Sequence, residues 1–323
     1  MPSGNANFST LAATTLQNFG NKIFDNVMTN NTLAYHLYKK GNVKITSGGR
    51  QFVHQVMYSQ NSTFAARAHT GTVPTTFTEP LSATEWNIKT ISGSIAMYAQ
   101  HIAMNAGDKE KLLDFVNAKK FEAETAMQEI LGDQVFNTTA GADDFDGIPR
   151  IISETPSVDT DVGGISSTSD SWWRNQIYTT AVTAFNTSQA GINAIDTTLM
   201  AATFGAMKPN LIVTTKAIQT LYVLGLSSNV RYDMLDEEGD AAPFPRMNYA
   251  GIPFVADDNC PTGNLYLINT DAIKLQVLSM GDMKMSPLQW STNQLSQSAL
   301  MYLFANLTCG DRRSSGVVNS ITA

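Results

Sequence analysis

The sequence predicts an α+β fold, and three observations lead to this class. Residues 108–132 carry the helical spacing of apolar residues, with Asp108 placed as an N-cap and Gly132 placed as a stop signal. The stretches that begin at Val43 and after Pro80 alternate apolar and polar residues, as half-buried strands do. The second half of the chain mixes short apolar runs with helical patterns, which indicates a second domain of helices and strands.

The composition bounds the function. A chain of 323 residues can form two domains, or one large domain with insertions. Only 15% of the residues are charged, against a usual fraction of about 25%, and such a surface is typical of a protein whose exterior is covered by neighbours, although β-rich monomers can look similar. The net charge of -7 argues against wrapping nucleic acid, which requires clustered lysine and arginine. No run approaches the roughly 18 consecutive apolar residues of a membrane span, so we expect no membrane partner.

The N-terminal residues form an arm that cannot fold alone. Phe19 and Phe24 belong to an irregular helical stripe over residues 7–30, surrounded by asparagine and threonine. These apolar side chains need a partner surface, which is either a neighbouring subunit or the body of the same chain. A second short helix is expected over residues 32–39.

A long projecting segment is expected after the arm. Period-two patterns predict two strands around residues 47–49 and a further long strand after Pro80. Residues 61–80 between them are rich in turn-forming residues and hold few large apolar side chains beyond Phe64 and Phe77. We therefore expect this segment to project as a long hairpin or loop, although a disordered insertion has the same composition.

The long helix is predicted to be a scaffold element without chemistry. At 1.5 Å per residue it would be about 36 Å long, enough to cross a domain. Lysines and glutamates within residues 119–124 interrupt its apolar stripe, so it should lie on a sheet. The apolar positions of the stripe are Leu112, Phe115, Val116, Ala123, Met127, Ile130 and Leu131.

The remaining elements follow from local patterns. A polar loop is expected after the long helix, and the acidic run 236–240 is expected to be a solvated turn. The predicted elements are a helix over 189–204, a buried strand from Leu211, a helix over 216–224, strands over 251–259 and 264–270, a strand over 272–280, and one or two strands over 296–310.

No catalytic or cofactor-binding constellation is found. The histidines His36, His54, His69 and His101 lack metal-ligand spacing, and no glycine-rich phosphate loop is present. His54 lies in an alternating strand, which favours a structural role. Cys260 and Cys309 form no C-x-x-C pair and are expected to be free thiols.

Two acidic clusters are candidate metal sites. Residues 143–147 have the closely spaced carboxylates and the glycine of a calcium loop but lack the downstream bidentate glutamate. Asp159 and Asp161 form a weaker cluster of the same kind. We therefore predict neither a metal site nor a cofactor.

Adjacent indoles mark a separate feature. Two adjacent indole side chains, here Trp172 and Trp173, rarely point the same way. One of them can therefore anchor the core while the other, or Arg174, reaches another surface. A core tryptophan with an accidental neighbour is an equal alternative.

Several of these segments together resemble a known family. These segments are, in order, FDGIPRII, VGGISSTSDSWWRN, KPNLIVTT, YAGIPFVADDNCP with YLINT, and NLTCGDRRSSGVVNSI. The ordered set is similar to the major capsid proteins of tailed bacteriophages with the Hong Kong 97-type fold, and the similarity extends from about Phe19 to Ile321.

The resemblance implies an architecture with an arm, an extended loop, a peripheral domain containing a long spine helix, and an axial domain. By this analogy the arm is residues 1–35, the extended loop is 50–86, the peripheral domain is 36–49, 87–136 and 265–305 with the spine helix at 108–131, and the axial domain is 137–264 and 306–323.

The resemblance further implies a structural protein of the virion. It would assemble in the host cytoplasm as homo-pentamers and homo-hexamers into an icosahedral head around double-stranded DNA, without sequence-specific binding and without enzymatic activity. Because the chain begins almost at the arm, a separate scaffolding protein is expected, together with a portal protein and a decoration protein. Some members crosslink through an extended-loop lysine, but no lysine lies between Lys44 and Lys89, so no such crosslink is expected.

Two rival functions stay open at this point. One is an encapsulin-like shell, a cellular compartment of the same fold, and the other is a metal-dependent soluble hydrolase that uses the acidic loop. For the capsid hypothesis, the candidate assembly residues are Phe19, Phe24, Arg50, Phe64, Arg67, Phe77, Trp86, Trp172, Trp173 and Arg174.

Overall fold

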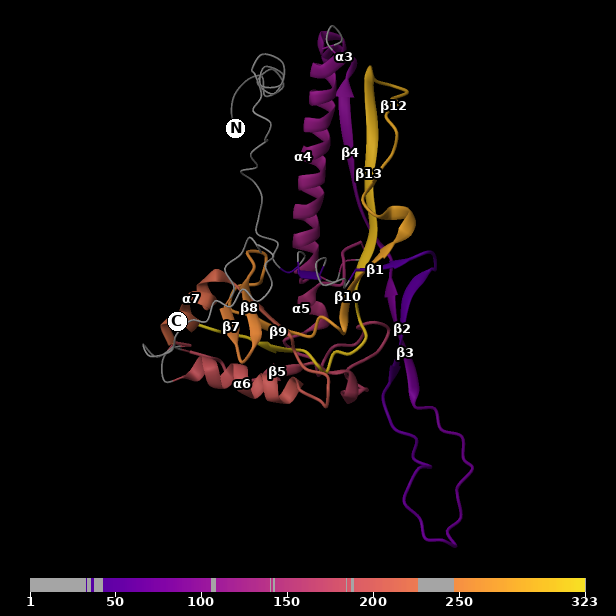
Figure 1. Cartoon of the computed structure of the whole chain (residues 1–323), viewed down its shortest axis with the longest axis vertical. Coiled ribbons are helices and arrows are strands. Elements are labelled where there is room, and N and C mark those ends of the chain that lie inside the picture. Colours follow the sequence, from indigo (N-terminus) through magenta and orange to yellow (C-terminus); the bar gives the residue numbers. More distant parts are fainter. Residues whose placement is uncertain are drawn as a thin grey trace.

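The computed structural model describes residues 33, 36–37, 43–105, 109–139, 141, 143–183, 185–186, 189–225 and 247–322. It confirms an α+β fold, with two six-stranded sheets, a two-stranded hairpin and one long helix (Figure 1). Leu33, His36 and Leu37 are helical and buried, in agreement with the short helix expected there. Phe19, Phe24 and the acidic run 236–240 lie outside the described residues.

The first sheet is built around one long strand. β13 (Ser296–Cys309) pairs antiparallel with β4 (Lys89–Tyr98) along one edge and with β10 (Ile273–Leu278) along the other. β1 (Val43–Thr46) adds to β10 in parallel, and the short strands β11 (Lys284–Met285) and β12 (Gln289–Trp290) pair with the first half of β13. The helical turn η2 (Ser279–Gly281) connects β10 to β11. Odd-numbered residues of β13 from 299 to 307 are buried, so the period-two pattern defines the core face.

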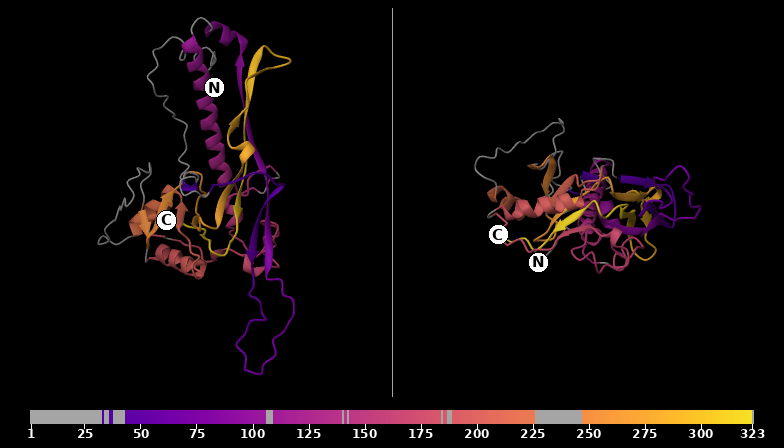
Figure 2. Two further views of the ribbon diagram at one scale, coloured as in Figure 1. Left: turned by 45° about the vertical axis from the view of Figure 1, so that its right-hand side comes forward. Right: turned by 90° about the horizontal axis from the view of Figure 1, so that it is seen from below.

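The long helix α4 (Lys109–Val135) runs beside β4 and follows the short helix α3 (Ala99–Asn105) (Figures 1 and 2). Its existence and start are as predicted, but the helix continues three residues beyond Gly132. Burial of Val135 and Phe136 in the core outweighs the cost of about 1 kcal/mol for a glycine inside a helix. Met127 and Leu131 are buried as expected, whereas Ile130 is 45% exposed and lies off the buried face.

The second sheet has the strand order β5-β14-β9-β6-β8-β7. Its strands are β5 (Gln176–Tyr178), β14 (Gly316–Val318), β9 (Leu265–Ile268), β6 (Leu211–Thr214), β8 (Ile252–Ala256) and β7 (Met247–Tyr249). The helices beside it are α6 (Ala190–Ala202) and α7 (Lys216–Gly225), and the loop before it holds α5 (Ile148–Ile151) and the turn η1 (Ser171–Trp173). The predicted helices and the strands β6, β8, β9, β10 and β13 are confirmed, whereas β5 and β14 have only three residues and no periodicity to detect.

Two predictions about the strands need correction. The alternating run after Pro80 is not one strand, because it divides at Ile88: β3 (Leu81–Asn87) pairs with β2 (Gln51–Met57), and β4 enters the first sheet. β9 lies between β6 and β14, so residues 265–268 belong to the second sheet and not with β10, where the predicted domain boundary placed them. The other domain boundaries stay a prediction.

Among the helices described, none is both long enough and apolar enough to cross a membrane.

Arg312 joins the connection between the two sheets to the long loop before β5. It lies in the short connection between β13 and β14, and its side chain is fully buried. Nε donates to the carbonyl oxygen of Ile151, Nη1 donates to Ser167 Oγ at 2.6 Å, and Nη2 donates to Asp159 Oδ2 at 2.8 Å. Burial lowers the pKa of the guanidinium and the Asp159 carboxylate opposes that shift. A buried charge is tolerated here because every side of it is hydrogen-bonded.

Substituting Arg312→Ala should lower the free energy of unfolding by about 3 to 5 kcal/mol, because it leaves a carboxylate and several buried polar groups without their partner. Urea denaturation followed by circular dichroism measures this loss. The matched control is Lys216→Ala, which removes the exposed ion pair with Asp258 and should cost less than about 1 kcal/mol. Equal losses in the two variants would contradict the role given to Arg312.

Candidate assembly interface

The hairpin β2–β3 is amphipathic, and its inner face holds it to the body. Phe52, Thr84 and Trp86 on this face are buried, and Phe52 and Trp86 are cross-strand partners. The sequence alternates because one face packs on the core and the other does not. The base of the hairpin is therefore fixed, and only the part beyond it projects.

The outer face of the hairpin exposes apolar side chains. Val53, Met57 and Leu81 are all exposed, and Met57 is paired with Leu81. The adjacent apolar residues in QFVHQVM are the sequence signal for apolar side chains on both faces. A two-stranded hairpin with an uncovered apolar face is marginal by itself and gains stability from a second surface.

The segment beyond the hairpin projects from the body, as predicted. Residues 58–80 form no strand or helix and extend far below the rest of the molecule (Figure 1). The phenyl rings of Phe64 and Phe77 are 83% and 86% exposed. Arg67 Nη2 donates to the carbonyl oxygen of Thr63 within this segment. Arg50 is exposed at the start of the hairpin.

The prediction that Trp86 is an assembly residue is wrong, because its side chain is buried in its own chain. Its ring fills the space above Gly163, where a Cβ atom would come within 2.8 Å of the ring and where φ is +64°. Both facts require glycine at that position. Trp86 Nε1 donates to Thr84 Oγ1, and Glu85 N donates to the carbonyl oxygen of Gly163. Trp86 therefore anchors the hairpin.

His54 forms a second anchor, in agreement with the structural role predicted for it. Its Nε2 atom lies 3.0 Å from the amide nitrogen of Gln276 and 3.1 Å from Thr308 Oγ1, on β10 and β13. The buried position of the ring favours the neutral imidazole. Burial lowers the pKa of His54, and Lys44 and Lys274 lower it further.

The two adjacent tryptophans lie in different environments. Trp173 is buried and donates from Nε1 to the carbonyl oxygen of Val162 at 2.8 Å. Trp172 is half-buried and stacks on Tyr58 at the base of the projecting segment, with ring centroids 5.3 Å apart. Arg174 is half-buried, and its Nε and Nη2 atoms donate to backbone carbonyls of its own loop. Trp172 thus joins the base of the projecting segment to the loop before β5.

The acidic clusters serve structure in the region described. Asp146 pairs with Arg150 and accepts from the side-chain amide of Asn306. Asp159 pairs with Arg312, and Asp161 accepts from the backbone N–H of Gly164. No group of three potential metal ligands occurs among the described residues.

The two cysteines are free, as predicted, and the structure shows that both are buried. Burial raises the pKa of the Cys309 thiol to about 12 and raises the pKa of Cys260 as well. Neither thiol is activated as a nucleophile, since activation requires a lowered pKa.

Comparison with solved structures shows that known proteins share this fold. The cyanophage A-1(L) capsid subunit superposes with a TM-score of 0.74 at 18% identity, over 95% of this chain and 98% of that chain. The capsid of a native GTA particle gives 0.60 at 11% identity, over 98% and 99%. The holo-SrpI encapsulin complex of Synechococcus elongatus PCC 7942 gives 0.59 at 11% identity, over 96% and 95%.

The chain therefore has the capsid fold of tailed-phage major capsid proteins, which an encapsulin shares. No protein-family model and no curated protein matches the sequence. The fold is thus recognised from the structure and from the ordered set of segments.

Replacing Trp173 with alanine should destabilise the chain by about 3 to 5 kcal/mol, because it empties a core position. Trp172→Ala removes a half-buried ring and should cost about 1 kcal/mol. Thermal and urea denaturation of the two variants measures both values. A larger loss for Trp172→Ala would reverse the assignment of anchor and contact residue.

Lowering the pH should weaken the contact of His54 with the first sheet, and so the attachment of the hairpin to it. The pKa of His54 in the folded state lies below 6.5, so its contribution to stability is complete above that pH. It is lost as the pH falls through the folded-state pKa, because the unfolded chain takes up the proton first. The stability difference between the wild type and His54→Asn, measured by urea denaturation, should shrink between about pH 7.5 and about pH 5. A difference that does not change with pH would show that His54 is not neutral in the folded state.

Proposed function

We propose that this protein is the major capsid protein of a tailed bacteriophage. It assembles as pentamers and hexamers into an icosahedral head around double-stranded DNA, and it has no catalytic activity. The observation that carries the proposal is the end-to-end agreement with a capsid subunit, 95% of this chain against 98% of that one. A shared domain inside an unrelated protein would not match over both full lengths.

The exposed surfaces of the chain support assembly. The outer face of the hairpin and the projecting segment present Val53, Met57, Phe64 and Phe77 without a covering element in the described chain. Stable protein interfaces bury about 1,600 Å² in total, and a projecting element reaches that area only by lying across another molecule. We propose that this element of one copy lies on the body of the next copy.

The outer face of the first sheet is the surface we propose to receive it. Leu300 on β13 is exposed there, and it is followed by the aromatic pair Tyr302 and Phe304, whose centroids are 5.2 Å apart. Their cross-strand partners on β4 are the small residues 90, 92 and 94. A ridge of large side chains beside a trough of small ones can hold the alternating side chains of a second hairpin.

The charge of the protein suits a container for DNA. A net charge of -7 gives weak attraction or mild repulsion toward packed DNA, so the wall does not adhere to its contents. A separate scaffolding protein, a portal protein and a decoration protein complete the proposed set of partners. We place the protein in the virion, after assembly in the host cytoplasm.

The encapsulin-like shell is the second candidate, because an encapsulin has the same fold over nearly the same length. Particle size separates the two functions. Shells built only of pentamers and loaded with protein would favour the encapsulin, whereas larger shells with hexamers would favour the phage head.

Negative-stain electron microscopy after size exclusion tests the proposal directly. Closed particles or hexameric capsomers are expected from the purified protein, alone or with a scaffolding protein. A monomer under every salt, pH and partner condition, with a bound stoichiometric divalent ion, would support the hydrolase instead.

Deleting residues 61–80 should leave a folded subunit that fails to form stable shells, since this segment makes no strand or helix in the described chain. Phe64→Ser combined with Phe77→Ser tests the same surface at constant length, and Val158→Ser is the matched control at an exposed apolar site elsewhere. Particle counts by microscopy and the unfolding temperature are measured together. Unfolding of the deletion variant would show that the segment belongs to the core.

A further inference from the structure

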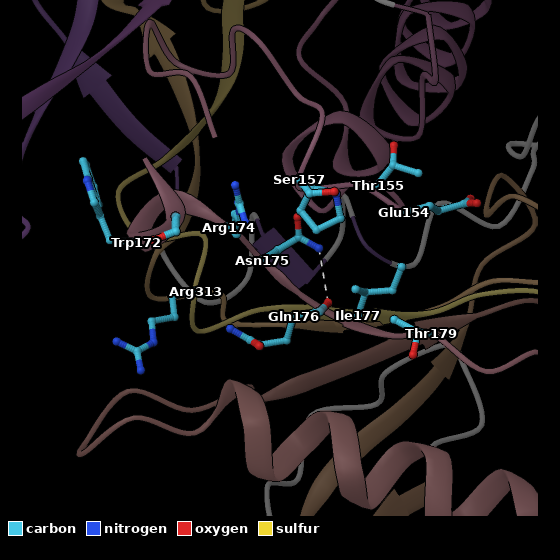
Figure 3. Close-up of a pocket in the computed structure, with 12 residues that line it drawn as sticks. Glu154, Thr155, Ser157, Trp172, Arg174, Asn175, Gln176, Ile177, Thr179 and Arg313 are labelled. Atoms are coloured by element: carbon cyan, nitrogen blue, oxygen red, sulfur yellow. Dashed lines mark hydrogen bonds between the residues drawn. The ribbon is translucent and has the colours of Figure 1, made fainter. Parts of the chain in front are cut away.

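A groove runs along the free edge of β5 in the second sheet (Figure 3). The loop of residues 154–157 forms one wall and residues 175–179 form the other. Trp172 and Arg313 lie at one end and Glu154 lies at the other, and the cavity has a volume of about 750 Å³. At about 3.3 Å per strand residue, the wall along β5 matches roughly four residues of an extended peptide.

The backbone of β5 offers unpaired groups to this groove. β5 is an edge strand, and it pairs only with β14, in parallel. Gln176 N donates to the carbonyl oxygen of Ser315, so Gln176 and Tyr178 face β14. Ile177 lies between them, and its N–H and C=O therefore point away from β14 toward the groove. Neither group has a partner among the described residues, and an open strand edge of this kind is a template for another strand.

The charges in the groove are divided between its ends. Arg174 lies on the Trp172 side, and its backbone hydrogen bonds fix the orientation of the guanidinium. Arg313 lies over the ring of Phe204, 4.1 Å from the centroid, and forms no ion pair in the described chain. Glu154 at the far end accepts from the side-chain amide of Asn264 at 2.7 Å. The arginine end is therefore the place where a ligand carboxylate gains most.

We propose that this groove is a peptide-binding site. It takes one extended segment of a partner protein by strand addition to β5, and a carboxylate side chain of that segment binds at the end of the groove where Arg174 and Arg313 lie. The main chain of Ile177 supplies the hydrogen bonds that hold any extended peptide. The two arginines supply the selectivity for an acidic residue.

The partner is a different protein and not a second copy of the projecting segment. Residues 58–80 are the long exposed extended stretch in the described chain, and they contain a single carboxylate, Glu79, beside Arg67 and His69. That charge pattern does not suit the arginine end. The site is independent of shell formation, so its test can fail while the capsid proposal stands.

Fluorescence anisotropy of a labelled Asp-Thr-Val-Thr-Val-Asp peptide, titrated with the full chain, tests this site. Aspartate at each end lets the peptide bind in either direction. We expect saturable binding, weakened about tenfold or more by asparagine in place of both aspartates and by Arg313→Gln. The peptide of residues 61–79 serves as the competitor that represents a second copy.

Ile177→Pro isolates the backbone contribution, because it removes the N–H that faces the groove and keeps the ladder to β14. Proline is tolerated in edge strands, and Ile177→Val is the matched control. Two N-methylated probes, modified at the valines or at the threonines, give the same information without changing the protein. One of the two should bind about tenfold more weakly than the other.

Several results would overturn the proposal. One is the absence of saturable binding at millimolar protein concentration. Another is equal affinity for the two N-methylated probes, and a third is equal affinity for the asparagine peptide and the aspartate peptide. Competition by residues 61–79 as strong as that of the acidic peptide would assign the groove to a second copy.

Discussion

One buried guanidinium joins the strand connection between the two sheets to the long loop before β5. Residues 296–318 pass through both sheets, as β13 at the centre of the first and as β14 inside the second, and Arg312 lies between them. Its donors reach Ile151, Asp159, Ser167 and Asn175, which are spread along residues 151–175 between helix α5 and strand β5. A charge buried without such partners would be too costly, so the position of the loop and the position of the strand connection depend on each other.

The same loop supports the extended hairpin. Gly163 gives room to Trp86 and accepts from the backbone of Glu85, and Trp172 stacks on Tyr58. His54 bonds the other side of the hairpin to the first sheet. The hairpin is therefore rigid at its base and uncovered beyond it, which suits an element that reaches another molecule.

The carboxylates that first suggested a metal site have another use. Asp146 and Asp159 are each satisfied by an arginine and a neutral side chain, so the acidic loop is part of the internal framework. The charges left for recognition are arginines at the surface, above all Arg313, which stacks on an exposed phenyl ring and has no carboxylate partner in the described chain.

The sequence by itself determined the α+β class, the long helix, the main strands and the projecting segment, because each depends on local spacing of apolar residues or on turn-forming composition. It did not reveal that Gly132 lies inside the helix, that the strand after Pro80 divides at Ile88, or that β9 joins β14. Those outcomes are decided by burial against residues far away in the chain. Arg312 and Ile177 likewise carried no signal, because a buried ion pair and an open strand edge are properties of neighbours that only the tertiary structure brings together.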